Sequence, residues 1–326
     1  MKRSRQQTWT LVLAAGDGTR LASMTTDARG NAVPKQFCSL AGGSTLMQDA
    51  MARARRIALR ERRCAIVAAQ HEQYWSRPLW SMPRGNVVVQ PRNRGTANGV
   101  LLAVLRILEL DPLARIVFLP SDHFVRDEDA LGGSLQQAVE LLHRGVNELV
   151  LIGIEPDEAD PELGYIVPRE RDAGGSRRVA RFVEKPPTAV AHELIGAGAL
   201  WNSFIFAADG PALLGLLREQ MPSVVEDMAT ALALDARRGV GPIALSSLYD
   251  ELPIVDFSKA IMANAADRLT VVTAPACGWS DLGTPMRVAQ ALRRIEPRAA
   301  RTRSGPAVEF GFINLAAQHA RLSLAR

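Results

Sequence analysis

The chain has 326 residues, of which 47% are hydrophobic and 22% charged, an ordinary globular composition with room for one large α/β domain or two modest ones. No apolar run approaches the roughly 20 residues that a membrane span needs. The basic N-terminus also lacks the apolar segment and cleavage site of a signal peptide. The three cysteines, Cys38, Cys64 and Cys277, are odd in number and widely spaced, which argues against a disulfide framework or a zinc site and for a reducing, cytoplasmic location.

The net charge of +5 suggests the hypothesis that the protein binds nucleic acid. However, the cations are scattered and no interleaved aromatic patch accompanies them. We therefore expect neither nucleic acid nor a membrane as a partner. Nearly all cations are arginines, and the only four lysines are Lys2, Lys35, Lys185 and Lys259. A lysine is a compact point charge, which suits a crowded phosphate site better than the wide fork of an arginine.

Short apolar strands alternate with helical patterns in the first half of the chain. Strands are predicted at 9–13, 64–69, 86–90, 115–120 and 148–154, and helices at 44–57, 71–80, 96–110 and 129–144. This βαβ alternation predicts an α/β fold with a largely parallel sheet.

The pattern changes after residue 154. Three β-like runs, 165–168, 178–184 and 200–206, indicate a smaller mixed sheet built over the first half. Two helices within 209–236, a helix at 255–264, a strand at 269–273 and a closing helix at 285–294 follow. Residues 1–293 are predicted to form one domain, and 294–326 a linker and a short tail.

A glycine-rich loop, Ala14-Ala15-Gly16-Asp17-Gly18-Thr19-Arg20, follows the first strand. Glycines let a phosphate or base approach the main chain, and Arg20 and Lys35 supply positive charge for a polyphosphate. The same residues also fit an ordinary turn with two surface cations. The loop lacks the Gly-Lys-Ser/Thr ending of a Walker loop, and Leu21 replaces the third glycine of a dinucleotide fingerprint, so neither an ATPase nor a dehydrogenase is favoured.

Two aspartates stand where a ligand would meet the sheet. Asp122 follows an apolar strand, and open α/β sheets bind ligands beyond the carboxyl ends of their strands. Asp281 lies in Gly278-Trp279-Ser280-Asp281-Leu282-Gly283. From position alone, either residue also fits a local turn or helix cap.

Several motifs recur in order along the chain: the first loop, Pro34-Lys35-Gln36-Phe37, Gln90 to Ala97, Leu119 to His123, Gly164 to Ile166, Val183 to Pro186, Trp201 to Ser203, and Gly278 to Gly283. Over residues 9–285 this set resembles the sugar-1-phosphate nucleotidyltransferases, most closely the mannose-1-phosphate guanylyltransferases. The resemblance implies a Rossmann-like nucleotide-diphospho-sugar transferase fold, with a mixed, mostly parallel central sheet and a smaller sugar-binding sheet. Residues 1–293 would then be the catalytic domain. Dimers are common in the family, which makes a homodimer an expectation.

The resemblance also implies a reaction between a nucleoside triphosphate (NTP) and a sugar 1-phosphate, with Mg²⁺ as cofactor. The implied preferred substrates are GTP and mannose 1-phosphate. The implied catalytic residues are Arg20, Lys35, Asp122 and Asp281, with Asp122 and Asp281 also as metal ligands. Nucleotide binding falls to Ala14, Ala15, Gly16, Gly18, Thr19, Gln90, Gly95 and Thr96. Sugar-phosphate binding falls to Gly164, Glu184, Lys185 and Asn202.

The sequence departs from the family pattern at three places. Leu21-Ala22-Ser23-Met24 replaces Leu-Trp-Pro-Leu, Arg94-Gly95-Thr96-Ala97-Asn98 replaces Arg-Asn-Thr-Ala-Pro, and Phe204 stands where relatives carry glycine. These changes leave open another NTP and sugar pair, such as one with glucose 1-phosphate, and a regulatory homologue that binds nucleotide-sugar without catalysis. A glycosyltransferase would be expected to carry an Asp-x-Asp motif, and the only such spacing, Asp127-Glu128-Asp129, looks like a solvated helix start.

Overall fold

The structure is a computed structural model that describes residues 8–27, 30–40, 42–145, 148–169, 176–239 and 241–295. The predicted tail, and all but residues 294 and 295 of the predicted linker, lie outside these ranges. None of the described helices is long and apolar enough to cross a lipid bilayer.

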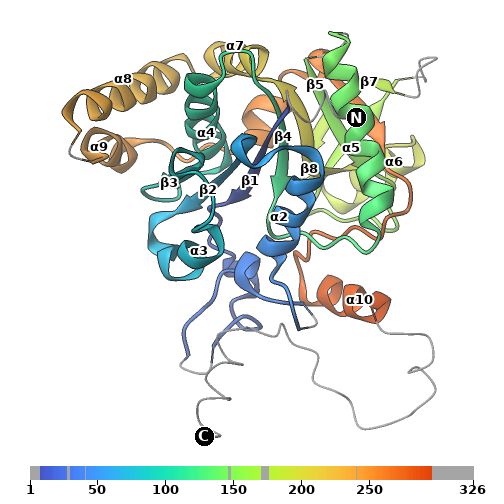
Figure 1. Ribbon diagram of the computed structural model, residues 1–326. Coiled ribbons are helices and arrows are strands. Elements are labelled where there is room, and N and C mark those ends of the chain that lie inside the picture. Colours follow the sequence, from blue (N-terminus) through green and yellow to red (C-terminus); the bar gives the residue numbers. More distant parts are fainter. Residues whose placement is uncertain are drawn as a thin grey trace, which may run out of the picture.

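One nine-stranded sheet runs through the molecule in the order β3-β2-β1-β4-β8-β5-β9-β7-β6 (Figure 1). Parallel pairs join β1 to β2 and β4, β2 to β3, and β5 to β9, as the βαβ alternation predicts. β8 runs antiparallel between β4 and β5. The strands are β1 (Thr8–Ala14), β2 (Arg63–Ala68), β3 (Val87–Gln90), β4 (Arg115–Pro120), β5 (Leu149–Ile154), β6 (Gly164–Pro168), β7 (Arg177–Glu184), β8 (Leu200–Asp209) and β9 (Leu269–Thr273).

The second half of the sheet closes on itself. β6 pairs with β7 and also with the start of β8, where Tyr165 lies opposite Trp201. β7 in turn pairs with β9, so β8, β5, β9, β7 and β6 form a ring. The predicted smaller sheet is this ring, and it is continuous with the central sheet. It places the end of β7 and the start of β8 on either side of the start of β6.

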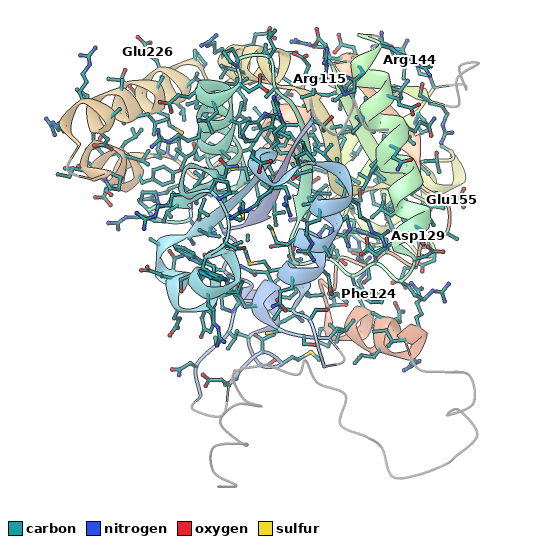
Figure 2. The ribbon with its side chains drawn as sticks, viewed as in Figure 1. Arg115, Phe124, Asp129, Arg144, Glu155 and Glu226 are labelled. Carbon is teal, nitrogen blue, oxygen red and sulfur yellow. The ribbon has the colours of Figure 1, made fainter. Side chains whose placement is uncertain are left out.

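Apolar residues alternate between the two faces of the strands, and helices cover both faces. On β1, Leu11 packs into one core and Val12 into the other. Residues of α2, α5, α6 and α10 cover the Val12 face, and residues of α4, α7, α8 and α9 cover the Leu11 face. Side chains occupy the space between these layers (Figure 2). The helices are α2 (Leu46–Ile57), α3 (Glu72–Leu79), α4 (Thr96–Leu110), α5 (Glu128–His143), α6 (Thr188–Gly196), α7 (Gly210–Gln220), α8 (Pro222–Arg238), α9 (Ile243–Glu251) and α10 (Pro285–Ile295).

The segment predicted as a helix at 255–264 differs from the prediction. Only a π-helical turn, Ser258–Met262, forms there. The residues before it lie along the loop that precedes α4, because the Val255 N–H donates to the Arg94 carbonyl (3.2 Å) and the Val255 carbonyl accepts from the Ala97 N–H (3.0 Å). These long-range bonds take the place of helical ones. α6 and α9 were not predicted.

Candidate active site

A cavity of about 500 Å³ opens at the carboxyl ends of β1 to β4, where the ring of strands meets the parallel half. Leu13, Ile66, Gln90 and Pro120 line it from these strands. The predicted site residues that also line it are Ala15, Gly16, Gly18, Arg20, Gly95, Thr96, Asp122, Glu184 and Lys185. A second cavity of about 650 Å³, between α2 and the end of α3, is lined by none of the predicted residues.

The first loop is held by side chains from other segments. Gln36 donates from Nε2 to the carbonyl oxygens of Ala14 (3.2 Å) and Gly16 (2.7 Å). Gly18 has a φ of 64°, and a Cβ there would lie 2.7 Å from the Lys35 backbone nitrogen. Only glycine therefore fits where this loop crosses the Lys35 segment. Thr19 begins a short 3₁₀ turn, and neither Ala14 nor Thr19 lines the cavity.

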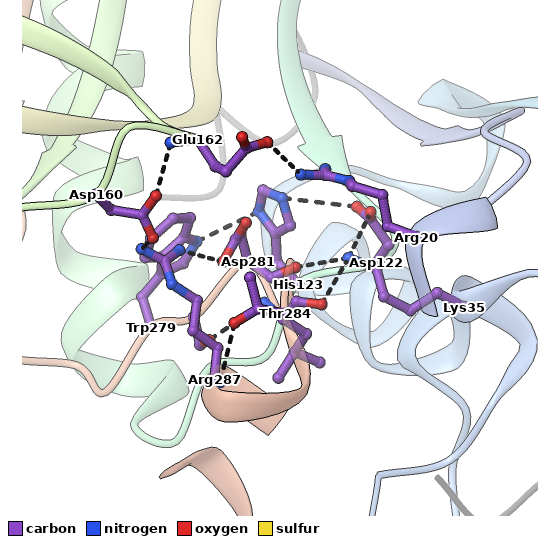
Figure 3. Close-up of polar contacts among 12 residues, drawn as sticks. Arg20, Lys35, Asp122, His123, Asp160, Glu162, Trp279, Asp281, Thr284 and Arg287 are labelled. Atoms are coloured by element: carbon purple, nitrogen blue, oxygen red, sulfur yellow. Dashed lines mark hydrogen bonds and ion pairs between the residues drawn. The ribbon is translucent and has the colours of Figure 1, made fainter. Parts of the chain in front are cut away.

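Lys35 joins the two predicted catalytic aspartates (Figure 3). Its Nζ lies 3.0 Å from Asp122 Oδ2 and donates to the Asp281 carbonyl oxygen at 2.6 Å. The Lys35 side chain is only 7% exposed, whereas that of Asp122 is 38% exposed and lines the cavity. Burial acts to raise the pKa of Asp122, but the Lys35 ammonium and His123 outweigh it and lower the pKa to about 2. Asp122 is therefore an ionised carboxylate at neutral pH.

His123 lies between the aspartates as a neutral side chain. Burial lowers the pKa of His123 to about 4, although Asp122 acts in the opposite direction. Its Nδ1 accepts a hydrogen bond from Trp279 Nε1 (3.3 Å), and its Nε2 lies 3.6 Å from Asp122 Oδ1. These contacts give His123 a structural role in holding the Trp279 segment beside Asp122.

Arg287, which sequence reasoning missed, holds the Asp281 carboxylate. It extends from α10, pairs with both Asp281 and Asp160, and lies over the Trp201 ring with its guanidinium carbon 5.1 Å from the centroid. Burial acts to raise the pKa of Asp281, but Arg287 outweighs it and lowers the pKa. The available signal was an arginine on the buried face of a helix, since Arg287 shares that face with Val288, Ala291 and Leu292.

The predicted sugar-phosphate residues Gly164, Glu184 and Asn202 meet at the start of β6, and we call this part of the site the sugar end. Glu184 Oε2 is buried and has no hydrogen-bond partner among the described residues. A Cβ at Gly164 would lie 2.5 Å from this oxygen, so the glycine makes room for the Glu184 carboxylate. Burial, together with the negative charge of Asp256, raises the pKa of Glu184 to about 7. Asn202 does not line the cavity, and its Nδ2 lies 3.4 Å from Ser258 Oγ.

The predicted base end lies between β3 and α4. Gln90 donates from Nε2 to the Arg92 carbonyl (2.6 Å), and its Oε1 fills the space beside Gly99. Thr96 Oγ1 accepts from the Phe257 N–H (2.8 Å), so this hydroxyl anchors the Phe257 segment. Gly95 has a φ of 85°, and a Cβ there would collide with the Val255 backbone.

The described non-glycine residues with positive φ lie in the predicted motifs or directly after one: Lys185 (48°), Phe204 (54°) and Leu282 (51°). Such residues are uncommon, and their strain is typically held in place at functional sites. Each follows a predicted site residue within two positions. The backbone is therefore strained at three points next to predicted site residues.

The known family that matches this chain is described as nucleotidyl transferase, and the match covers residues 9–297. The chain belongs to the nucleotidyl transferase family. This confirms the resemblance and the fold class read from the ordered motifs.

Among relatives of this nucleotidyl transferase, the xanthan biosynthesis protein XanB of Xanthomonas campestris pv. campestris (strain B100) is 29% identical, over 84% of this chain and 57% of the relative. A mannose-1-phosphate guanylyltransferase of Klebsiella pneumoniae is 28% identical, over 84% of this chain and 58% of the relative. The chain therefore spans a little over half the length of these relatives.

Solved structures agree with the family. A crystal structure described as mannose-1-phosphate geranyltransferase from Thermus thermophilus is 31% identical, with a TM-score of 0.72 over 85% of this chain and 77% of that one. A UDP-glucose pyrophosphorylase bound to UDP-glucose is 16% identical with a TM-score of 0.58, a likeness that concerns the fold alone.

Proposed function

We propose that this nucleotidyl transferase joins an NTP to a sugar 1-phosphate, with GTP and mannose 1-phosphate as the preferred pair. A phosphate oxygen of the sugar 1-phosphate forms a bond to the α-phosphorus of the NTP, and the bond to the β-phosphate breaks to release pyrophosphate. The observation that carries the proposal is the buried Lys35, which binds both the Asp281 carbonyl and Asp122, and Asp122 lines a cavity at the carboxyl edge of the sheet.

The chain's own residues supply positioning and charge, which is what such a transfer needs. Arg20 lines the cavity beside the glycine loop, and we assign its guanidinium, which lies 3.3 Å from Glu162 Oε2, to neutralising the triphosphate. The Lys35 backbone packs against Gly18 of the same loop, and its Nζ binds Asp122 and the Asp281 carbonyl. Lys185 lines the cavity next to Glu184, and we assign it to the phosphate of the sugar.

Mg²⁺ belongs to this proposal, and the donor set fits it. The Asp122 carboxylate is ionised and partly exposed, while the Asp281 carboxylate has Oδ1 engaged by Arg287. No cluster of three or more acidic, histidine or cysteine side chains suited to a metal exists within the described residues. Mg²⁺ commonly takes one or two carboxylates and completes its shell with phosphate oxygens and water. When bound by Asp122 and Asp281, it would neutralise negative charge on the phosphates.

GTP is the preferred nucleotide in this proposal because the motifs resemble the guanylyltransferase branch. Guanine presents two donor groups and an O6 acceptor, and backbone groups of the first loop together with Gln90 lie in reach of one cavity. A pyrimidine would leave some of these groups unpaired, at roughly 1–3 kcal/mol each. A homodimer and a cytoplasmic location stay predictions of the sequence.

Pyrophosphate release tests the proposal, measured with GTP, UTP, dTTP and CTP against mannose and glucose 1-phosphates. We expect GTP with mannose 1-phosphate to be used at least about tenfold better than the pyrimidine pairs. Preference for a pyrimidine triphosphate would refute the guanylyl assignment alone. Absence of turnover with every pair would refute the transferase proposal.

Two substitutions test the carrying observation. Asp122→Asn should lower kcat by about 10²–10³, as the loss of other charge stabilisers does. Lys35→Arg should fail to restore activity, because a planar fork cannot replace an ammonium that meets a carboxylate and a carbonyl in a buried space. Asp129→Asn and Lys259→Arg, both at exposed positions, are the matched controls. Full activity in either test variant contradicts the assigned role.

A further inference from the structure

The sugar end of the cavity has a wall that the family motifs do not include. Ile254, Asp256 and Ser258 line the cavity from the segment before the π-helical turn. This segment is fixed to the α4 loop by the Val255 and Phe257 N–H groups, and Asn98 Nδ2 donates to the Pro253 carbonyl (2.8 Å). It is therefore a built part of the site and not a free loop.

Phe204 forms the other side of this wall. Its N–H donates to Asn202 Oδ1 (3.1 Å), and the next N–H, of Ile205, donates to Ser203 Oγ (3.2 Å), which holds the backbone in its left-handed conformation. The ring packs edge-on against Phe257, with centroids 5.9 Å apart. Phe204 is only partly buried and lines the cavity, so part of the ring faces the space that a substrate would fill.

Asp256 adds negative charge to the same end. Its Oδ1 accepts the Lys259 backbone N–H (2.9 Å). Asp256 and Glu184 both line the cavity, and the charge of Asp256 acts on the Glu184 carboxyl, whose Oε2 is unpartnered among the described residues. A carboxyl pair of this kind accepts hydroxyl hydrogen bonds and repels another carboxylate.

We propose that Phe204 and Asp256 select the sugar, so that neutral hexose 1-phosphates bind and the corresponding hexuronic acid 1-phosphates are refused. Phe204 offers an apolar surface to the carbon–hydrogen face of a pyranose ring, as aromatic side chains do in binding sites. Asp256, beside Glu184, accepts sugar hydroxyls and disfavours a carboxylate at C6. This inference rests on the proposed function, because it assumes that the sugar 1-phosphate occupies this end.

Isothermal titration calorimetry tests the selection without requiring turnover. The ligands are matched pairs that differ only at C6: mannose with mannuronic acid 1-phosphate, and glucose with glucuronic acid 1-phosphate. For the preferred hexose, we expect the uronic acid to bind on the order of 100-fold more weakly, the size expected for like charges about 5 Å apart near a protein surface. Asp256→Asn should narrow this ratio at least about tenfold, and Asp267→Asn, an exposed aspartate on the neighbouring turn, should leave it unchanged.

Phe204→Gly separates a binding role from a structural one. Glycine adopts positive φ without strain, so we expect no large loss in melting temperature. The Kd for the hexose 1-phosphate should rise about tenfold or more, while the Kd for the NTP stays unchanged. A lower melting temperature with unchanged sugar affinity would show a packing role and overturn the assignment of Phe204.

The inference and the proposed function fail in different ways. Equal affinity for a hexose and its uronic acid, an unchanged ratio in Asp256→Asn, or no binding of any sugar 1-phosphate overturns the selection. Absence of pyrophosphate release, with the selective binding intact, overturns the transfer reaction and leaves the selection standing.

Discussion

Arg287 offers the sharpest test of how the site is held together, because it is a buried cation with two carboxylate partners. Its side chain is 6% exposed, and those of Asp160 and Asp281 are 13% and 11% exposed. Arg287→Met keeps the apolar stem but leaves two carboxylates without their cation. Breaking a buried ion pair in this way costs about 3–5 kcal/mol, and the contact with Trp201, worth about 1–2 kcal/mol where desolvated, is lost as part of it.

Thermal unfolding, in EDTA and without substrates, measures this loss directly. For a domain of this size, about 1 kcal/mol corresponds to roughly 2–4 °C, so we expect the melting temperature to fall by roughly 6–20 °C. Arg294→Met is the matched control on the same helix, since Arg294 pairs with Asp157 at 3.0 Å on the surface. That substitution should cost less than about 1 kcal/mol.

Equal melting temperatures for the two variants would refute the reasoning, because they would mean that the buried pairs contribute no more than a solvated one. Adding Asp160→Asn to Arg287→Met should restore most of the lost melting temperature, and that result would support the reasoning. In that double variant one of the two stranded charges has been removed.

Two further predictions concern stability. The pKa of Glu184 is raised to about 7, so its ionised form is penalised in the folded protein, and the penalty grows as pH rises from about 4.5 to 7. In urea unfolding, the free energy of unfolding of Glu184→Gln minus that of the wild type should therefore increase by on the order of 1–3 kcal/mol between pH 5 and pH 8. A difference that is constant with pH would contradict the burial of this carboxylate near Asp256. Gly95→Ala should lose more than about 2 kcal/mol, because a positive φ adds to a collision with the Val255 backbone. Gly198→Ala, at a φ of 79° with open space around it, should lose only about 1 kcal/mol, and equal losses would mean that the Val255 segment moves aside freely.

The parallel half of the sheet could be predicted from the sequence because the signals for its strands are local. The apolar runs that became β1, β2, β3 and β4 are bounded by turns and separated by helical patterns, and this fixes strand type and parallel pairing. Sequence reasoning also placed Asp122 at a strand end that borders the cavity. The ring of β5 to β9 was harder, since antiparallel partners far apart in sequence leave no periodic signature of which strands meet.

Two features that escaped prediction, the segment 253–257 and Arg287, share one property, which is that partners distant in the chain decide their state. The segment from Pro253 to Phe257 has an apolar pattern that suits a helix, yet its backbone donors find Arg94 and Thr96. Arg287 looks like a surface cation until its two carboxylates are in place.

At Phe204, the sequence and the structure each supply part of the explanation. The sequence marks it as a departure from a glycine position, and the structure supplies the reason that glycine is expected there, a φ of 54°. A phenylalanine gains nothing from that conformation, which costs roughly 1–2 kcal/mol for a residue with a Cβ. The benefit must therefore come from where the ring lies, against Phe257 and at the edge of the cavity. Comparing the sugar affinity and the melting temperature of Phe204→Gly separates the gain from packing against Phe257 and Phe206 from the gain at the cavity.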